Sequence, residues 1–181
     1  MTRQQLAGEI YKAAYITGEF LLRSGKTSNE YFDKYQFESN PVLLNAISDH
    51  LLDIMPNDYD YLGALEMGGI PLATLLSVKT GKPVLFTRKR AKEYGTRRFA
   101  EGPDYNGKKI LIIEDVVTSG GQIILSTKDL RDTGGIIEHA MCVIDRESAG
   151  VEALVENNIK LHSLFTMSYI KESAKEMGYL V

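Results

Sequence analysis

Four consecutive aliphatic residues, Ile110 to Ile113, constrain the fold of this chain more than any other feature. An unbroken aliphatic run is typical of a strand that is buried on both faces, as in a parallel sheet covered by helices. Two carboxylates follow it, Glu114 and Asp115, and then small residues from Thr118 to Gly121 lead into a helical pattern. The sequence therefore predicts a strand, a loop and a helix, the repeating unit of an α/β fold.

The rest of the chain repeats this alternation. Besides the strand at 109–114, strands are expected at 19–22, 31–35, 61–65, 83–87, 136–144 and 161–165. Helices are expected at 3–17, 40–52, 70–79, 120–132, 148–157 and 168–177, with Asn40 as a cap before Pro41 and Ser168 as a cap of the last helix. Residues 88–107 lack a period and are expected to form a long loop. We predict one domain, residues 1–181, with a parallel sheet flanked by helices, in which ligands bind outside the carboxyl ends of the strands.

Composition narrows the class of protein. The formal net charge of −3 does not favour nucleic-acid binding, and no apolar run reaches the length of a membrane span. No signal peptide is recognisable at the N-terminus, so we expect a soluble cytoplasmic protein. The single cysteine, Cys142, lies in an apolar run and is expected to be buried rather than nucleophilic. His50, His139 and His162 show no metal-ligand spacing, so they are interpreted as structural or exposed.

The segment after the aliphatic strand suits a sugar phosphate. Backbone N–H groups of the loop and the helix N-terminus attract a phosphate, and two carboxylates can accept hydrogen bonds from vicinal hydroxyls. The alternative is an ordinary strand-to-helix turn with a solvated acid pair and a helix cap. The block resembles the phosphoribosyl diphosphate (PRPP) signature of the type I phosphoribosyltransferases. The resemblance implies that Glu114 and Asp115 hold the ribose hydroxyls, and that the 5-phosphate region is formed by Val116, Val117, Thr118, Ser119, Gly120, Gly121 and Gln122.

A second glycine-rich turn follows the strand at 61–65. Glycines let a backbone approach a ligand closely, and peptide N–H groups can face diphosphate oxygens. Alone, the turn could equally be a plain connection. Beside the first block it resembles the diphosphate-binding loop of the same family, with contacts from Glu66, Met67, Gly68 and Gly69.

The run from Arg88 to Arg98 holds six basic residues and one acid. Composition alone favours a solvated loop or a nucleic-acid patch. Its start at a strand end and the Tyr94-Gly95-Thr96 hinge favour a lid that stabilises a leaving diphosphate. The run resembles the catalytic loop of the orotate phosphoribosyltransferases. This implies that Arg88, Lys89 and Lys92 act on the site of a partner subunit and that Tyr94 contacts PRPP, with Lys92 the better proton donor because Tyr94 stands where many members have His.

The stretch from Phe20 to Asp33 contains Gly25-Lys26-Thr27, which ends like a phosphate-binding P-loop. The match fails because position 20 is Phe20 instead of glycine. The stretch resembles the N-terminal segment of the orotate branch instead, which implies that Arg23 contacts PRPP and that Tyr31 and Phe32 lie against the pyrimidine. It departs from that pattern at Arg23 and at Asn29-Glu30. The alternative for the aromatic pair is a strand with one ring in the core.

Two charged residues, Asp145 and Arg146, follow the strand expected at 136–144. The simple interpretation is a capping Asp and a surface Arg. In the orotate branch, which this I-D-R sequence resembles, the arginine pairs with the carboxylate of the pyrimidine, and Arg suits a planar anion because its donors form a fixed fork. The resemblance implies that Arg146 and Thr118 contact orotate and that Tyr31 and Phe32 complete its site.

Taken together, the resemblance implies a Mg²⁺-dependent glycosyltransferase, a pentosyltransferase that joins orotate and PRPP into orotidine 5'-monophosphate and diphosphate in UMP biosynthesis. It implies catalytic roles for Lys92, Arg88, Lys89 and Asp115, a homodimer, a small N-terminal hood at 1–40, a mobile loop at 88–107, and Mg²⁺ held mainly by substrate and water, its direct protein ligands unknown. The alternatives are a phosphoribosyltransferase for another base, a non-enzymatic PRPP-binding regulator on the same fold, and a nucleic-acid-binding module.

Overall fold

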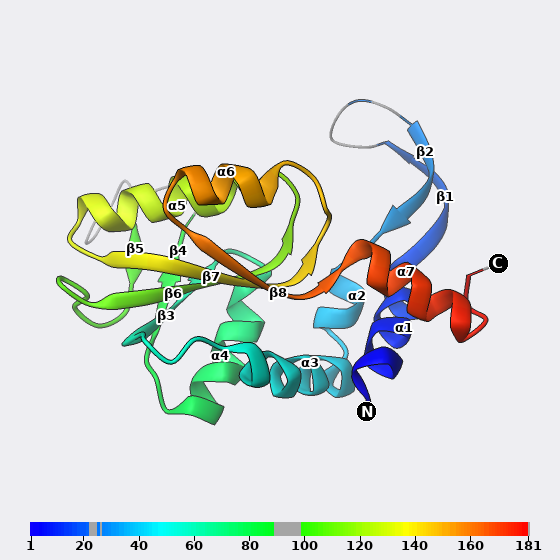
Figure 1. Ribbon diagram of the computed structural model, residues 1–181, viewed down its shortest axis with the longest axis horizontal. Coiled ribbons are helices and arrows are strands. Elements are labelled where there is room, and N and C mark those ends of the chain that lie inside the picture. The colour runs from blue at the N-terminus through cyan, green and yellow to red at the C-terminus, as the bar shows by residue number, and fades with distance from the viewer. Residues whose placement is uncertain (22–24, 26, 89–98, 181) are drawn as a thin grey trace.

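A six-stranded sheet forms the centre of the molecule in the computed structural model, which describes residues 1–21, 25, 27–88 and 99–180 (Figure 1). Its strand order is β5-β4-β3-β6-β7-β8, and all neighbours are parallel except β4 and β5. The strands are β3 (Tyr61–Leu65), β4 (Val84–Thr87), β5 (Ala100–Glu101), β6 (Lys109–Val117), β7 (Ile136–Asp145) and β8 (Lys160–Thr166). The predicted α/β fold with a mostly parallel sheet is confirmed.

Helices cover both faces of this sheet. Figure 1 shows α5 (Gly121–Asp132) and α6 (Gly150–Glu156) on one side, and α3 (Pro41–Ile54) and α4 (Gly69–Thr80) on the other. Successive residues of β6 serve the two faces in turn: Ile112 packs with the buried residues of α5 and α6, whereas Ile113 packs with those of α3 and α4. The aliphatic run is therefore buried on both sides, as its sequence predicts.

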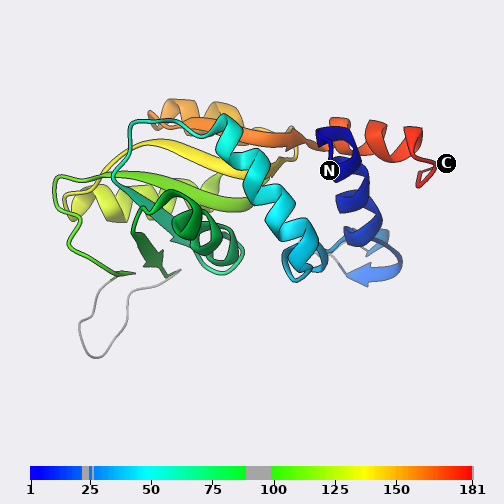
Figure 2. The same cartoon turned by 90° about the horizontal axis from the view of Figure 1, so that it is seen from below.

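A second group of elements stands beside the sheet (Figures 1 and 2). It consists of α1 (Arg3–Ala14), the antiparallel hairpin of β1 (Tyr15–Leu21) and β2 (Thr27–Phe32), the short α2 (Tyr35–Glu38) and the C-terminal α7 (Met167–Glu176). Ile10 of α1 and Ile170 of α7 are fully buried in the same hydrophobic cluster as the inner residues of α3 and α4. The two ends of the chain thus share one core with a face of the sheet.

The N-terminal elements differ from the expected boundaries. The first helix ends at Ala14 instead of residue 17, because Tyr15 to Thr17 pair with Glu30 to Phe32 as strands. The expected strand at 31–35 is displaced to Thr27–Phe32, and Tyr35 already begins α2. Periodicity alone did not separate these short elements, since they are stabilised by pairing with each other.

Three further boundaries correct the predictions. The strand expected at 109–114 continues to Val117, because Val116 and Val117 pair with the end of β7, so the acid pair lies within the strand. The last helix is capped by Thr166 rather than Ser168. Ala100–Glu101 form a short strand inside the predicted loop.

Among the described residues, each helix is too short or too polar to pass through a lipid bilayer.

Candidate functional site

The predicted binding segments meet at the carboxyl ends of four adjacent strands. Ala64 of β3 lies opposite Ile113 of β6, Leu65 lies opposite Thr87 of β4, and Val117 of β6 lies opposite Asp145 of β7. The residues after each strand end are therefore neighbours in space. This brings together the glycine-rich turn after β3, the start of the basic run after β4, the loop after β6 and Arg146 after β7.

The loop after β6 encloses a cavity of about 360 Å³ at the N-terminus of α5. Gly120 precedes the helix with φ of +69°, a left-handed conformation that glycine adopts without strain. The first turn of α5 has no side-chain cap at Gly120, and such helix N-termini attract anions through their backbone N–H groups. The cavity is lined by Glu114, Val116, Val117, Thr118, Ser119, Gly120, Gly121, Gln122, Ile123 and Leu125.

Glu114 and Asp115, the two carboxylates predicted to hold the ribose hydroxyls, occupy different environments. Glu114 lines the cavity of the phosphate loop. Asp115 is not among the residues that line it, and its side chain has no solvent exposure. One oxygen of Asp115 accepts the N–H of Val116, and the other forms an ion pair with Lys34.

Lys34 and Glu38 are site residues that sequence reasoning missed. Lys34 stands at the position before α2 and its side chain reaches Asp115, while the buried Glu38 at the end of α2 also borders Asp115. No motif pointed to them, because a four-residue helix gives no periodic signal and their charges resemble those of any surface turn. Only the folded chain brings this turn against the strand that carries the acid pair.

Glu38, Glu114 and Asp115 form an acid cluster. Among the described residues Lys34 is the cation that faces it, and one positive charge cannot balance three carboxylates. Burial, together with the charge of Asp115, raises the pKa of Glu38 and of Glu114 to about 9. Burial also acts to raise the pKa of Asp115, but hydrogen bonds from the two glutamates and the charge of Lys34 outweigh it and lower that pKa. Within the cluster the ionised form is thus favoured at Asp115 and disfavoured at both glutamates.

The glycines after β3 are required by packing. A Cβ atom on Gly69 would lie 2.2 Å from the backbone oxygen of Ile113, and one on Gly68 would lie 1.4 Å from Oδ2 of Asp115. These contacts explain both glycines through the close approach of the turn to β6. They also place the predicted diphosphate loop, Glu66 to Gly69, directly against Asp115.

A second cavity, of about 290 Å³, lies between the hairpin, α1 and α7. It brings together three of the four residues predicted to contact orotate: Tyr31, Phe32 and Arg146. Thr118 lines the phosphate-loop cavity instead. The remaining lining residues are Tyr11, Tyr15, Ser28, Glu30, Met167 and Lys171. Arg146 at the strand end thus faces an aromatic wall supplied by a different part of the chain.

Glu30, which departs from the family pattern, has a partner inside this second cavity. The hydroxyl of Tyr15 donates to Oε2 of Glu30 at 2.6 Å, and this hydrogen bond raises the pKa of Tyr15 to about 12. Lys171 of α7 adds a cation that sequence reasoning missed. It lies far from every motif in the sequence, so only the packing of α7 against α1 could reveal it.

Of the basic run, the structure describes only Arg88. Arg88 donates its backbone N–H to Phe99 O and forms an ion pair with Glu101 at 3.8 Å, so Arg88 lies beside the residues that follow the run. Lys89, Lys92 and Tyr94, and also Arg23 of the N-terminal segment, lie outside the described residues. Their predicted roles stay predictions.

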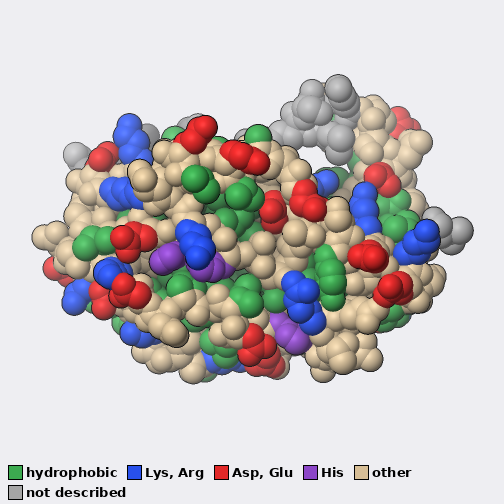
Figure 3. All heavy atoms as spheres, in the orientation of Figure 1, with side chains coloured by type: hydrophobic (Ala, Val, Ile, Leu, Met, Phe, Trp, Pro, Cys, Tyr) green, Lys and Arg blue, Asp and Glu red, His purple; other side chains and the backbone are tan. Residues whose placement is uncertain are grey.

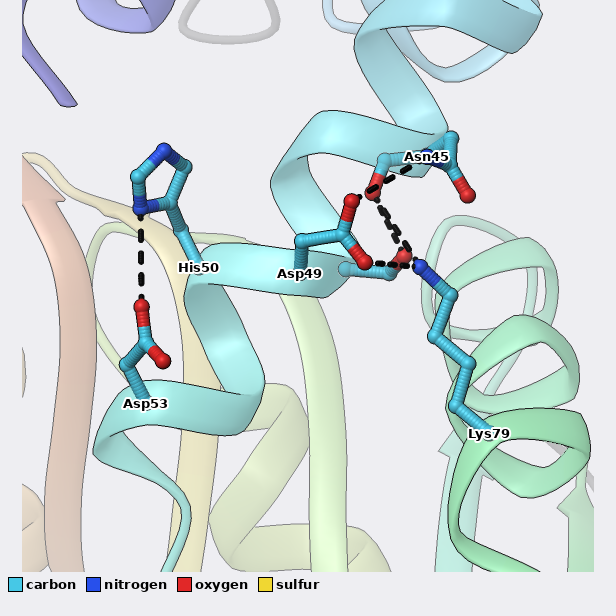
Figure 4. Close-up of polar contacts among 6 residues, drawn as sticks. Asn45, Asp49, His50, Asp53 and Lys79 are labelled. Atoms are coloured by element: carbon cyan, nitrogen blue, oxygen red, sulfur yellow. Dashed lines mark hydrogen bonds and ion pairs between the residues drawn. The ribbon is translucent and has the colours of Figure 1, made fainter. Parts of the chain in front are cut away.

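Cys142 and the three histidines line neither of the two cavities. Cys142 is buried, and burial raises the pKa of its thiol. His139 and His162 contact each other at 3.1 Å between β7 and β8, and His50 faces Asp53 on α3 (Figure 4). In the part of the chain that the structure describes, no group of three or more His, Cys, Asp or Glu side chains could hold a metal ion.

Comparison with known proteins first shows the protein family to which this chain is similar. The phosphoribosyl transferase domain family matches residues 38–157, which contain both glycine-rich loops and the acid pair. The orotate phosphoribosyltransferase of Nocardioides sp. (strain ATCC BAA-499 / JS614) is 42% identical over 173 residues, 96% of each chain. That of Methanocella arvoryzae is 40% identical over 162 residues, 90% of this chain and 89% of the relative.

The fold agrees with this class. The crystal structure of Mycobacterium tuberculosis H37Rv orotate phosphoribosyltransferase in complex with PRPP superposes with a TM-score of 0.79 at 22% identity, over 93% of this chain and 98% of that one. At this identity the match concerns the fold alone. The relatives in sequence and the matching domain family show that the chain belongs to the orotate phosphoribosyltransferase family.

Proposed function

We propose that this protein transfers the 5-phosphoribosyl group of PRPP to orotate, giving orotidine 5'-monophosphate and diphosphate in pyrimidine biosynthesis. The observation that carries the proposal is the cavity in which Arg146 faces Tyr31 and Phe32. An arginine beside aromatic rings suits a planar base that bears a carboxylate. The family membership of the chain supports the same activity.

PRPP extends over the other parts of the site in this proposal. Its 5-phosphate lies in the cavity at the N-terminus of α5, where Thr118 to Gln122 supply N–H groups and hydroxyls. Glu114 lines that cavity and accepts or donates a hydrogen bond to a ribose hydroxyl, according to its protonation. The diphosphate lies along Glu66 to Gly69, next to the acid pair.

The reaction displaces diphosphate from the anomeric carbon of the ribose. Orotate is already an anion, so its nitrogen needs no strong base. The barrier therefore lies in the charge that develops as the ribose becomes cationic and the diphosphate departs. The residues of the site act chiefly by holding the two substrates in line and by balancing that charge. Arg88, with Lys89 and Lys92 from outside the described residues, is proposed to act on the departing diphosphate.

Mg²⁺ is proposed as the cofactor, and when bound it supplies positive charge to the diphosphate and ribose oxygens. The residues present fit an ion held chiefly by substrate and water, because Glu114 offers a side-chain oxygen at the phosphate cavity and would release its proton to bind the ion, and Mg²⁺ in proteins keeps several waters. We also propose that the protein is a cytoplasmic homodimer in which the basic run after Arg88 serves the partner's site.

The alternatives differ in what they require of the same residues. A regulator that senses PRPP needs the phosphate loop but not the base cavity with Arg146. A nucleic-acid-binding module needs a broad basic surface, whereas Figure 3 shows acidic and basic side chains interspersed over the face it presents. A purine enzyme gains nothing from an arginine placed for a carboxylate.

The test follows the ultraviolet absorbance of orotate with PRPP and Mg²⁺. We expect orotate to be consumed by the wild type, and Arg146→Met to raise KM for orotate at least tenfold with little change in KM for PRPP. Arg131→Met offers a control, since Arg131 donates to the backbone oxygens of Ile137, Asn157 and Asn158, which line neither cavity. Consumption of adenine or hypoxanthine instead of orotate would overturn the proposed base. PRPP binding without consumption of any base would favour the regulator.

A further inference from the structure

Asp115 is predicted to bind a ribose hydroxyl, although its side chain is completely buried. A carboxylate that receives a ribose hydroxyl must present an oxygen to the ligand, yet the side chain of Asp115 has no solvent exposure. One of its oxygens accepts the N–H of Val116, and the other is paired with Lys34. A ribose can therefore reach Asp115 only if one of the groups around it moves.

The surroundings of Asp115 differ in how readily they can move. Gly68 contacts it through the backbone of a turn that is packed against β6, and Val116 is fixed in the β6–β7 ladder. Glu38 is 94% buried at the end of α2. Lys34 moves more readily than these three groups, because its side chain is 30% exposed and its ammonium group sits on a flexible four-carbon stem. Its displacement disturbs no backbone hydrogen bond.

A nearby position would receive the displaced ammonium group. Gly68, which touches Asp115, belongs to the turn from Glu66 to Gly69 that we assign to the diphosphate. This turn carries one carboxylate and no basic residue. A diphosphate seated there brings several negative charges next to the acid cluster, so it requires a cation close at hand. Lys34 already lies against the residue that borders this turn.

We propose that Lys34 is a PRPP-binding residue. In the free protein its ammonium group pairs with Asp115; when PRPP binds, a ribose hydroxyl replaces the ammonium group at Asp115, and the Lys34 side chain turns to pair with the diphosphate. The two events are then coupled: binding of the ribose releases the cation that the diphosphate needs. This inference rests on the proposed function for the identity of PRPP as ligand. It assigns a role to a residue in the turn between β2 and α2, outside both glycine-rich loops.

The exchange predicts that replacing Lys34 changes the Kd of two related ligands differently. PRPP carries a diphosphate, whereas ribose 5-phosphate carries the same ribose and 5-phosphate without it. In Lys34→Met, PRPP loses its cation, so we expect its Kd to rise at least tenfold in titration calorimetry with Mg²⁺ present. Ribose 5-phosphate no longer has to displace an ammonium group from Asp115, so its Kd should stay the same or fall. Lys34→Arg keeps the cation and should bind PRPP within about threefold of wild type.

Lys79 provides a matched control. It forms an ion pair with Asp49 between α4 and α3 (Figure 4), and its side chain is 20% exposed. Lys79→Met therefore removes another partly buried lysine from an aspartate, at a place outside both cavities. We expect it to leave the Kd of both ligands unchanged. Equal weakening of PRPP and ribose 5-phosphate by Lys34→Met would overturn the proposal, because it would mean that Lys34 only maintains the shape of the site.

A second measurement uses the wild-type side chain, in case Lys34→Met does not fold. Reductive ¹³C-methylation of the lysines gives an NMR signal for Lys34, identified by its absence in Lys34→Arg. We expect PRPP to shift this signal, and an unchanged signal at saturating PRPP would contradict the exchange. Orotate is absent from both experiments. A wild type that binds PRPP but consumes no orotate would thus overturn the proposed base and leave the Lys34 comparison valid.

Discussion

At the scale of single residues, the acid cluster makes stability depend on pH. Glu38 is faced by Asp115, Lys34 and Asp33, and Glu114 by Asp115 and Lys34. Both glutamates have a folded pKa of about 9, above the ordinary 4.5. Between these values the folded protein keeps protons that the unfolded chain releases. The free energy of unfolding therefore falls as the pH rises through this window, by at most about 1.4 kcal/mol per pH unit for each group.

Glu38→Gln tests this sign. The amide keeps the shape and the donor of the protonated glutamate but has no proton to lose, so we expect the variant to gain stability relative to wild type as the pH rises from 6 to 9. Thermal unfolding across that range measures the difference. The exposed Glu172 of α7 supplies the control, and Glu172→Gln should run parallel to wild type. A difference between Glu38→Gln and wild type that does not change with pH would show that Glu38 is ionised in the folded protein.

At the scale of elements, the turn from β3 into α4 is set by backbone packing. Gly69 begins α4 and Gly121 begins α5, and both helices have 12 residues. A Cβ atom at Gly69 meets the backbone of Ile113 at 2.2 Å, whereas one at Gly121 meets only Ser119 Oγ at 3.5 Å. We expect Gly69→Ala to cost about 2–3 kcal/mol, since neither strand nor turn can yield, and Gly121→Ala to change stability by less than about 1 kcal/mol. Urea unfolding compares the two, and equal costs would contradict this account.

The C-terminal helix α7 lies beyond residues 38–157 of the family match, yet Lys171 lines the base cavity. A second cation beside Arg146 should favour a base that carries a carboxylate. We expect Lys171→Met to raise KM for orotate about three- to tenfold and to leave KM for PRPP unchanged. Lys175→Met, one turn further along the same helix, should change neither constant. A rise in both constants for Lys171→Met would indicate a general disturbance of α7.

The same elements show what a sequence can predict here. The strand at Tyr61–Leu65 and the cap at Asn40 were predicted correctly because their signals are local: an apolar run and a capping side chain. The phosphate loop was placed from its glycines and the strand before it. Lys34, Glu38 and Lys171 gave no such signal, because their importance arises from contacts with residues far away in the chain. The end of α1 was misplaced for a similar reason, since hairpin pairing outweighed helical spacing.

At the scale of the whole molecule, the base cavity depends on how the hairpin, α1 and α7 are fixed to the sheet. Arg146 comes from the end of β7, whereas Tyr31 and Phe32 come from the hairpin. Because Ile10 and Ile170 share a buried cluster with the α3 and α4 face, the N- and C-terminal elements should unfold together with the sheet. The base cavity is then as stable as the fold itself, and no separate docking step precedes binding.

Two core substitutions test this cooperativity. Ile10→Ala empties a site in α1, and Leu130→Ala empties one in α5 on the opposite face of the sheet; both side chains are fully buried. Each should cost about 2–5 kcal/mol and lower the midpoint of one common transition. Scanning calorimetry should give one peak in both variants, with near- and far-ultraviolet circular dichroism changing at the same temperature. If Ile10→Ala instead produced an early transition that removed orotate binding while most of the helical signal remained, the N-terminal elements would form a separate unit. The base cavity would then depend on the docking of that unit, and orotate affinity would fall with temperature before the sheet unfolds.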